Sequence, residues 1–85
     1  MSNFEKILLK ILQGNSDNNI HFSELCQCLK RLGFDIRING SHHIFYRQDI
    51  KEILNLQPKG NKAKPYQLKQ VRNLIIKYKL DGEDL

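Results

Sequence analysis

The dipeptide Asn39-Gly40 is the feature that most limits how this chain can fold. Apolar and polar residues alternate before it, in residues 34–38 (FDIRI), and the apolar stretch SHHIFY follows it. Alternation with a period of two is typical of a strand with one buried face, and Asn-Gly tolerates the positive φ angles of a type I′ turn. The sequence therefore predicts a β-hairpin here, in which Ile38 pairs with Ser41.

Apolar spacing predicts three helices and one further strand around this hairpin. Helical periodicity is present in residues 3–13, in residues 24–32 after Ser23 as N-cap, and in a last helix that begins at Pro65. The inner face of that last helix is expected to carry Leu68, Val71, Leu74, Ile75 and Tyr78. A third strand is expected over residues 53–57 and ends at Pro58. This order indicates an α+β fold with the helices on one face of a three-stranded antiparallel sheet and the other face open.

Positive charge is concentrated in the second half of the chain. The sequence has 14 basic and nine acidic residues, and three of the acidic ones fall in the last five positions. No Asp or Glu occurs from Ile53 to Leu80, where the basic residues are Lys59, Lys62, Lys64, Lys69, Arg72, Lys77 and Lys79. Such a field favours a polyanion such as nucleic acid, although a solvated face of solubilising lysines has the same composition.

The two cysteines give information on the redox state of the protein's cellular compartment and on whether the chain binds a metal ion. Cys26 and Cys28 are two residues apart, so on a helix they point in different directions and cannot form a disulfide with each other. We therefore expect reduced thiols in a cytoplasmic protein. A zinc site completed by His42 and His43 is disfavoured because the cysteine spacing lacks the two-residue gap of a chelating loop, so no metal or other cofactor is expected. A membrane span and a signal peptide are not expected either.

The predicted hairpin places the two adjacent histidines on opposite faces of the sheet. With Ile38 opposite Ser41, His43 shares the core face with Phe45, whereas His42 faces solvent. An imidazole can take and return a proton near neutral pH. We therefore regard His42 as the better candidate for an acid–base catalyst and His43 as a side chain packed at the edge of the core; a slip of one residue would exchange them.

This chemistry suits metal-free cleavage of RNA, in which a base removes the 2′-hydroxyl proton and cations stabilise the phosphate. The candidate cations are Arg37 on the strand, Lys59, Lys62 and Lys64 in the loop, and Lys69 and Arg72 on the last helix. Two alternatives without catalysis stay open. One is an RNA-binding module in which His42, Phe45 and Tyr46 stack on unpaired bases. The other is a protein-interaction domain whose charges attract an acidic partner.

Two stretches of the sequence carry a recognisable set of motifs. They are LKRLGFDIRINGSHHIF, residues 29–45, and PKGNKAKPYQLKQVRNLI, residues 58–75. Through its Leu-Gly-Phe helix end, Gly-Ser-His strand start and Gly-Asn-Lys loop, the chain resembles the HicA (YcfA-like) toxin family of bacterial and archaeal toxin–antitoxin systems. The resemblance implies a fold similar to a double-stranded-RNA-binding domain. It also implies a metal-independent endoribonuclease that cleaves mRNA (an mRNA interferase) and is inhibited by a HicB-type antitoxin.

The resemblance further implies site residues and a division of the chain. The family's catalytic histidine corresponds to His42, with His43 as the alternative. Many members have a histidine at the position of Lys59. Any accessory role of that histidine therefore has no counterpart in this chain. The chain divides into an extension over residues 1–20, a HicA-like domain over 21–80 and an acidic tail over 81–85. The helix of the extension either pads the core or offers a contact surface to another protein, and its apolar stripe favours padding.

Overall fold

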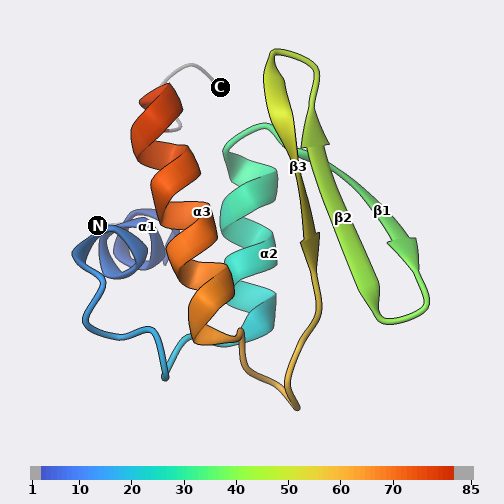
Figure 1. The fold of residues 1–85 in the computed structure, drawn as a ribbon. Helices are drawn as coiled ribbons and strands as arrows, with labels where there is room; N and C mark the ends of the chain where they lie inside the picture. Colours follow the sequence, from blue (N-terminus) through green and yellow to red (C-terminus); the bar gives the residue numbers. More distant parts are fainter. Residues whose placement is uncertain (1–2, 82–85) are drawn as a thin grey trace.

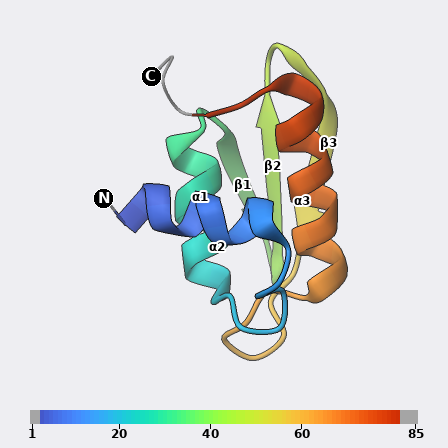
Figure 2. The ribbon, with the colours of Figure 1, turned by 90° about the vertical axis from the view of Figure 1, so that its left-hand side faces the viewer.

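The computed structural model describes residues 3–81, so the predicted acidic tail, apart from Asp81, lies outside the described residues. The elements are α1 (Asn3–Gln13), α2 (Phe22–Arg31), β1 (Asp35–Asn39), β2 (His42–Arg47), β3 (Ile50–Leu56) and α3 (Pro65–Tyr78). The strands form one antiparallel sheet in the order β1-β2-β3. Helices α2 and α3 cover one face of it, and α1 crosses their outer side (Figure 1, Figure 2). The predicted α+β fold, with a core like a double-stranded-RNA-binding domain after an extra helix, is confirmed.

The core lies between the sheet and the helices. Its completely buried side chains come from all three layers and include Ile11, Leu25, Leu29, Phe45, Leu54, Leu56, Leu68 and Val71. The predicted inner face of α3 is confirmed, because its aliphatic members are buried and Tyr78 packs against the core at the last turn. Within residues 3–81, none of the helices has the length and apolar character needed to cross a bilayer.

The β1–β2 hairpin forms where predicted, but its register differs by two residues. Asn39 pairs with His42 and Ile38 with His43, so the two-residue loop is Gly40-Ser41. Gly40 has a φ of 62°, and Lys79 is the one non-glycine residue with positive φ in the described part of the chain. Glycine at the first central position is typical of a type II′ turn, so the predicted type I′ turn is wrong. A shift of two residues leaves every side chain on its predicted face.

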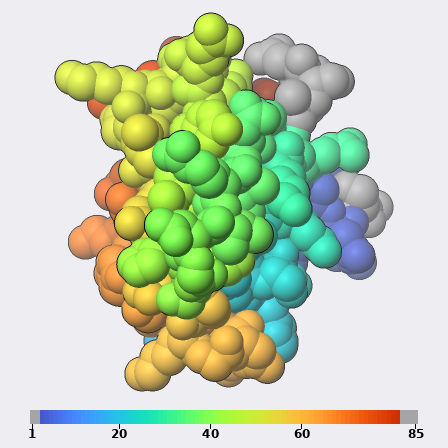
Figure 3. Space-filling view, turned by 90° about the vertical axis from the view of Figure 1, so that its right-hand side faces the viewer, coloured from blue at the N-terminus to red at the C-terminus, as the bar shows by residue number. Residues whose placement is uncertain are grey.

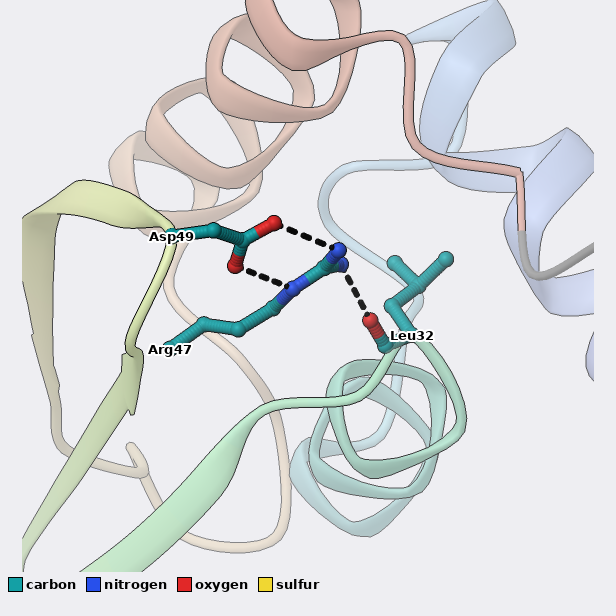
Figure 4. Close-up of polar contacts among 3 residues, drawn as sticks. All are labelled: Leu32, Arg47 and Asp49. Atoms are coloured by element: carbon teal, nitrogen blue, oxygen red, sulfur yellow. Dashed lines mark hydrogen bonds and ion pairs between the residues drawn. The ribbon is translucent and has the colours of Figure 1, made fainter. Parts of the chain in front are cut away.

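Strand β3 begins at Ile50, three residues earlier than predicted, because Arg47 closes a tight turn before it. Arg47 donates from Nε and Nη2 to the two carboxylate oxygens of Asp49, at 2.7 and 2.9 Å (Figure 4). Its Nη1 donates to the carbonyl of Leu32 at 2.7 Å. The hairpin between β2 and β3 is thereby fastened to the end of α2. In the sequence, the charged residues of this turn look like part of an ordinary exposed loop. The first three residues of β3 were therefore not predicted.

Helix α2 begins at Phe22, so the predicted N-cap Ser23 lies inside its first turn. His21 is the N-cap, with extended backbone angles of φ −67° and ψ 143°. The Glu24 side chain accepts a hydrogen bond from the His21 backbone N–H at 3.0 Å. Backbone hydrogen bonds from this segment to the loop before α3 determine where the helix starts. These bonds join distant parts of the chain, so a local capping signal did not reveal them.

Helix α1 completes the outer side of the core. Leu8 and Ile11 are buried with residues of α2 and α3. Arg72 of α3 holds the end of the helix, because its guanidinium donates to both carboxylate oxygens of Asp17 at 3.1 Å and to the Ile11 carbonyl at 3.0 Å. These contacts support the padding role that the apolar stripe of the helix indicates.

Glu52 of β3 joins the sheet to the last turn of α3. Its carboxylate accepts hydrogen bonds from Lys77 Nζ, at 2.7 Å, and from the Tyr78 hydroxyl. The hydrogen bond from Lys77 and then that from Tyr78 lower the pKa of Glu52 to about 2. Both contacts therefore favour the ionised carboxylate.

We expect acid to weaken this junction. A carboxyl group whose pKa is depressed by folding contributes stability above its unfolded pKa of about 4.3, and the contribution is lost as pH falls toward its folded pKa. The melting temperature of the wild type should therefore exceed that of Glu52→Gln at neutral pH, and the difference should shrink between about pH 5 and about pH 2. Circular dichroism melts across this range measure it. Asp35→Asn, which removes an exposed carboxylate from β1, should keep the wild-type dependence; a pH-independent difference for Glu52→Gln would contradict the prediction.

Candidate functional site

The sheet face opposite the helices is open to solvent (Figure 3). On it, a row of side chains crosses the three strands, because Arg37 pairs with Ile44 and Ile44 pairs with Asn55. His42 lies two residues before Ile44 on the same face, so Arg37 and Asn55 flank it diagonally from the neighbouring strands. His42, Arg37 and Asn55 are exposed. An accessible imidazole therefore lies between a guanidinium and an amide.

The ring of His42 is held on one side only. Its Nδ1 lies 3.0 Å from the side-chain oxygen of Asn55. For Nε2, the described residues provide no hydrogen-bond partner. The unengaged nitrogen is thus the one that a ligand on the open face can reach.

His43 lies on the other face, which confirms the predicted faces of both histidines. Its ring packs edge-on against Phe22 of α2, with centroids 4.9 Å apart and planes at 77°. Its Nδ1 lies 3.1 Å from the Ser41 carbonyl, which can only accept, so Nδ1 donates. The half-buried ring lines a groove of about 320 Å³ between α2 and β1, shared with Cys26 and Ile38. His43 is therefore a packed side chain rather than part of the open face.

The loop between β3 and α3 lies at the same end of the sheet as the Gly40-Ser41 turn (Figure 1). Beyond the end of β3, Gln57 Nε2 donates to the Ser41 hydroxyl at 2.8 Å. Lys59 and Lys62 follow in a tight turn closed by two hydrogen bonds between their own backbones, and both are exposed. Lys64, the half-buried N-cap of α3, ends the loop. We call Lys59, Lys62 and Lys64 the lysine loop; it lies at the His42 end of the sheet.

Two of the predicted RNA-binding residues lie elsewhere. Lys69 and Arg72 are on α3, which covers the face of the sheet opposite to His42 (Figure 1). The Arg72 guanidinium is occupied by Asp17, and its side chain is 17% exposed. We therefore assign Arg72 to the packing of α1 and leave both residues out of the candidate surface. Sequence alone could not show this, because the pairing with Asp17 spans most of the chain.

His21 also lies at the lysine loop, although sequence analysis did not single it out. Its backbone forms a β-bridge with Lys62. On either side of the bridge, Phe22 N–H donates to the Asn61 carbonyl and Ala63 N–H to the Ile20 carbonyl, each at 2.9 Å. A third imidazole is thus placed beside the basic loop. No local motif predicts it, because the paired segments are far apart in the sequence.

The two cysteines carry protonated thiols. Burial raises the pKa of Cys26 to about 11 and that of Cys28 to about 12. Near neutral pH they are therefore not the thiolates that bind zinc or act as nucleophiles. In the part of the chain that the structure describes, no three His, Cys, Asp or Glu side chains come together as a metal-ligand set.

A family model described as the HicA toxin of bacterial toxin–antitoxin systems matches residues 22–78. The match begins at the first residue of α2 and ends at the last residue of α3, so it includes the whole sheet and both helices that cover it. Helix α1 lies outside it. No curated protein and no solved structure matches the chain.

Proposed function

Because the chain belongs to the HicA toxin family of bacterial toxin–antitoxin systems, we propose that it is an endoribonuclease that cleaves mRNA without a metal ion. The observation that carries this proposal is the exposed imidazole of His42 on the open face, flanked by Arg37. The lysine loop lies at the same end of the sheet. His42 can thus accept a proton at one RNA phosphate, while Arg37 and the lysine loop bind that phosphate and the adjacent ones.

The proposed reaction is a transesterification within the RNA chain. Nε2 of His42 takes the proton of a 2′-hydroxyl, and the 2′ oxygen attacks the adjacent phosphorus. The bond from phosphorus to the 5′ oxygen breaks, that oxygen takes up a proton from water, and His42 releases to solvent the proton that it accepted. The products are a 2′,3′-cyclic phosphate and a 5′-hydroxyl end. Arg37 and the lysine loop stabilise the negative charge on the phosphate oxygens during the attack.

Exposed apolar side chains on the same face offer a surface for unpaired bases. Tyr46 is 39% exposed and Ile53 is 62% exposed, and both lie on the open face by strand alternation. A tyrosine ring can stack on a base without sequence preference. Phe45, predicted as a further stacking group, is completely buried in the core and cannot contact RNA.

The family implies an antitoxin partner, and we propose that a HicB-type antitoxin inhibits this chain by covering the open face. Carboxylates of the partner would pair with Arg37 and the lysine loop, and an apolar group would pack on Ile53. Such complementarity excludes RNA without altering the fold. The same charges that hold phosphate would thus hold the inhibitor.

Cleavage of a test RNA by the purified chain in the presence of EDTA tests the proposed function. We expect products that end in a 2′,3′-cyclic phosphate. A matched RNA with 2′-O-methyl groups should bind but stay intact, because the attacking oxygen is blocked. Equal degradation of both RNAs would contradict the mechanism. Binding of the unmodified RNA without cleavage would favour the alternative, a non-catalytic RNA-binding module on the same surface.

A further inference from the structure

The position of Asn55 relative to His42 is determined by the sheet. Asn55 opposes Ile44, and the neighbouring pairs His43–Leu56 and Phe45–Leu54 are in regular register. The irregularity in the β2–β3 ladder lies beyond this region, toward Arg47. The backbone therefore holds the amide at a diagonal distance that suits the 3.0 Å contact with the ring.

The chemistry of this contact decides which ring nitrogen carries the proton. A side-chain amide oxygen only accepts hydrogen bonds, so Nδ1 of His42 must donate to Asn55. A neutral imidazole has one N–H, which leaves the lone pair on Nε2. The opposite amide orientation would donate to Nδ1 and place the proton on Nε2, and the ring could not then accept a proton there.

We propose that Asn55 is a positioning residue that holds the neutral His42 ring in the Nδ1–H tautomer and thereby makes Nε2 the general base. This role rests on the proposed function, since it concerns the base of the same reaction. A neutral amide suits the position. A carboxylate would accept the same hydrogen bond but would bring negative charge close to the RNA phosphate.

Nitrogen-15 chemical shifts of the His42 ring, recorded at a pH where the ring is neutral, test the tautomer directly. We expect the Nδ1–H form in the wild type and in Asn55→Asp, which keeps an acceptor, and a mixture of tautomers in Asn55→Ala. Gln57→Ala is the matched control, because it removes a nearby amide that bonds the Ser41 hydroxyl instead of the ring. Its His42 tautomer should equal that of the wild type. The Nε2–H form in the wild type would overturn the proposal.

Kinetics separates positioning from RNA contact. Asn55→Ala should lower kcat by about 2- to 10-fold, the range expected for one neutral hydrogen bond, and leave KM nearly unchanged. Asn55→Asp should restore kcat while raising KM, because its charge repels phosphate. A rise in KM alone for Asn55→Ala would mean that Asn55 contacts RNA, and would overturn the proposal.

Different results would overturn the RNA-cleaving function and the role of Asn55. A wild-type chain that cleaves no RNA would overturn the proposed function and this role with it. A wild-type chain that cleaves RNA with the proton of His42 on Nε2 would overturn the role of Asn55 alone.

Discussion

Replacing His42 with alanine is expected to lower the rate of RNA cleavage by about 10²- to 10⁴-fold, the usual contribution of a general acid–base group. The loss follows because water must then remove the 2′-hydroxyl proton. RNA affinity should change little, since the cations of Arg37 and of the lysine loop are retained. Single-turnover cleavage measures the rate, and fluorescence anisotropy with a 2′-O-methyl RNA measures binding without cleavage.

His43→Ala is the matched control, because it removes the adjacent imidazole from the opposite face. Its edge-on contact with Phe22 is worth about 0.5–1.5 kcal/mol, so the variant should lose some stability. At a temperature where it is fully folded, it should keep most of the cleavage rate. Loss of cleavage in His43→Ala but not in His42→Ala would assign catalysis to His43. Wild-type cleavage in both variants would exclude these imidazoles as the base.

Replacing Ile11 with alanine is expected to lower the free energy of unfolding by about 2–5 kcal/mol. Its side chain is completely buried beneath α1, so its removal leaves a cavity between that helix and the rest of the core. For a domain of this size, each kcal/mol should lower the melting temperature by roughly 4–8 °C. Urea and thermal denaturation, followed by circular dichroism, measure both quantities.

Leu12→Ala is the control for this variant, since Leu12 is the next residue of α1 and is 37% exposed. Substitutions at exposed positions usually change stability by about 0.5 kcal/mol or less. If Ile11→Ala were as stable as Leu12→Ala, α1 would add little to the domain. That result would favour the division of the chain into an extension over residues 1–20 and an independent domain over residues 21–80. The large loss that we expect would instead make α1 part of one folding unit.

Local periodicity predicted the order of the helices and strands within residues 3–81. It also predicted the face of the sheet on which His42 lies, because alternation along a strand persists whichever residues form the turn. The first and last residues of the helices and strands were less predictable. The start of β3 depends on the Arg47–Asp49 pair, and the start of α2 depends on backbone bonds between the neighbours of His21 and a distant loop. The turn was assigned the wrong type because the loop is Gly40-Ser41 and not Asn39-Gly40, so Gly40 occupies the first central position of a type II′ turn.

The sequence by itself determined the elements, the basic second half and an imidazole that faces solvent, because each depends on residues close together in the chain. Only the tertiary structure decided which groups share a surface with that imidazole. It placed Arg37 and Asn55 beside His42 on the open face and the lysine loop at the same end of the sheet, and it committed Arg72 to Asp17 on the opposite, helix-covered side. The physical reason is that these contacts arise from strand register and helix packing between segments far apart in the chain, which local patterns of charge and hydrophobicity do not encode.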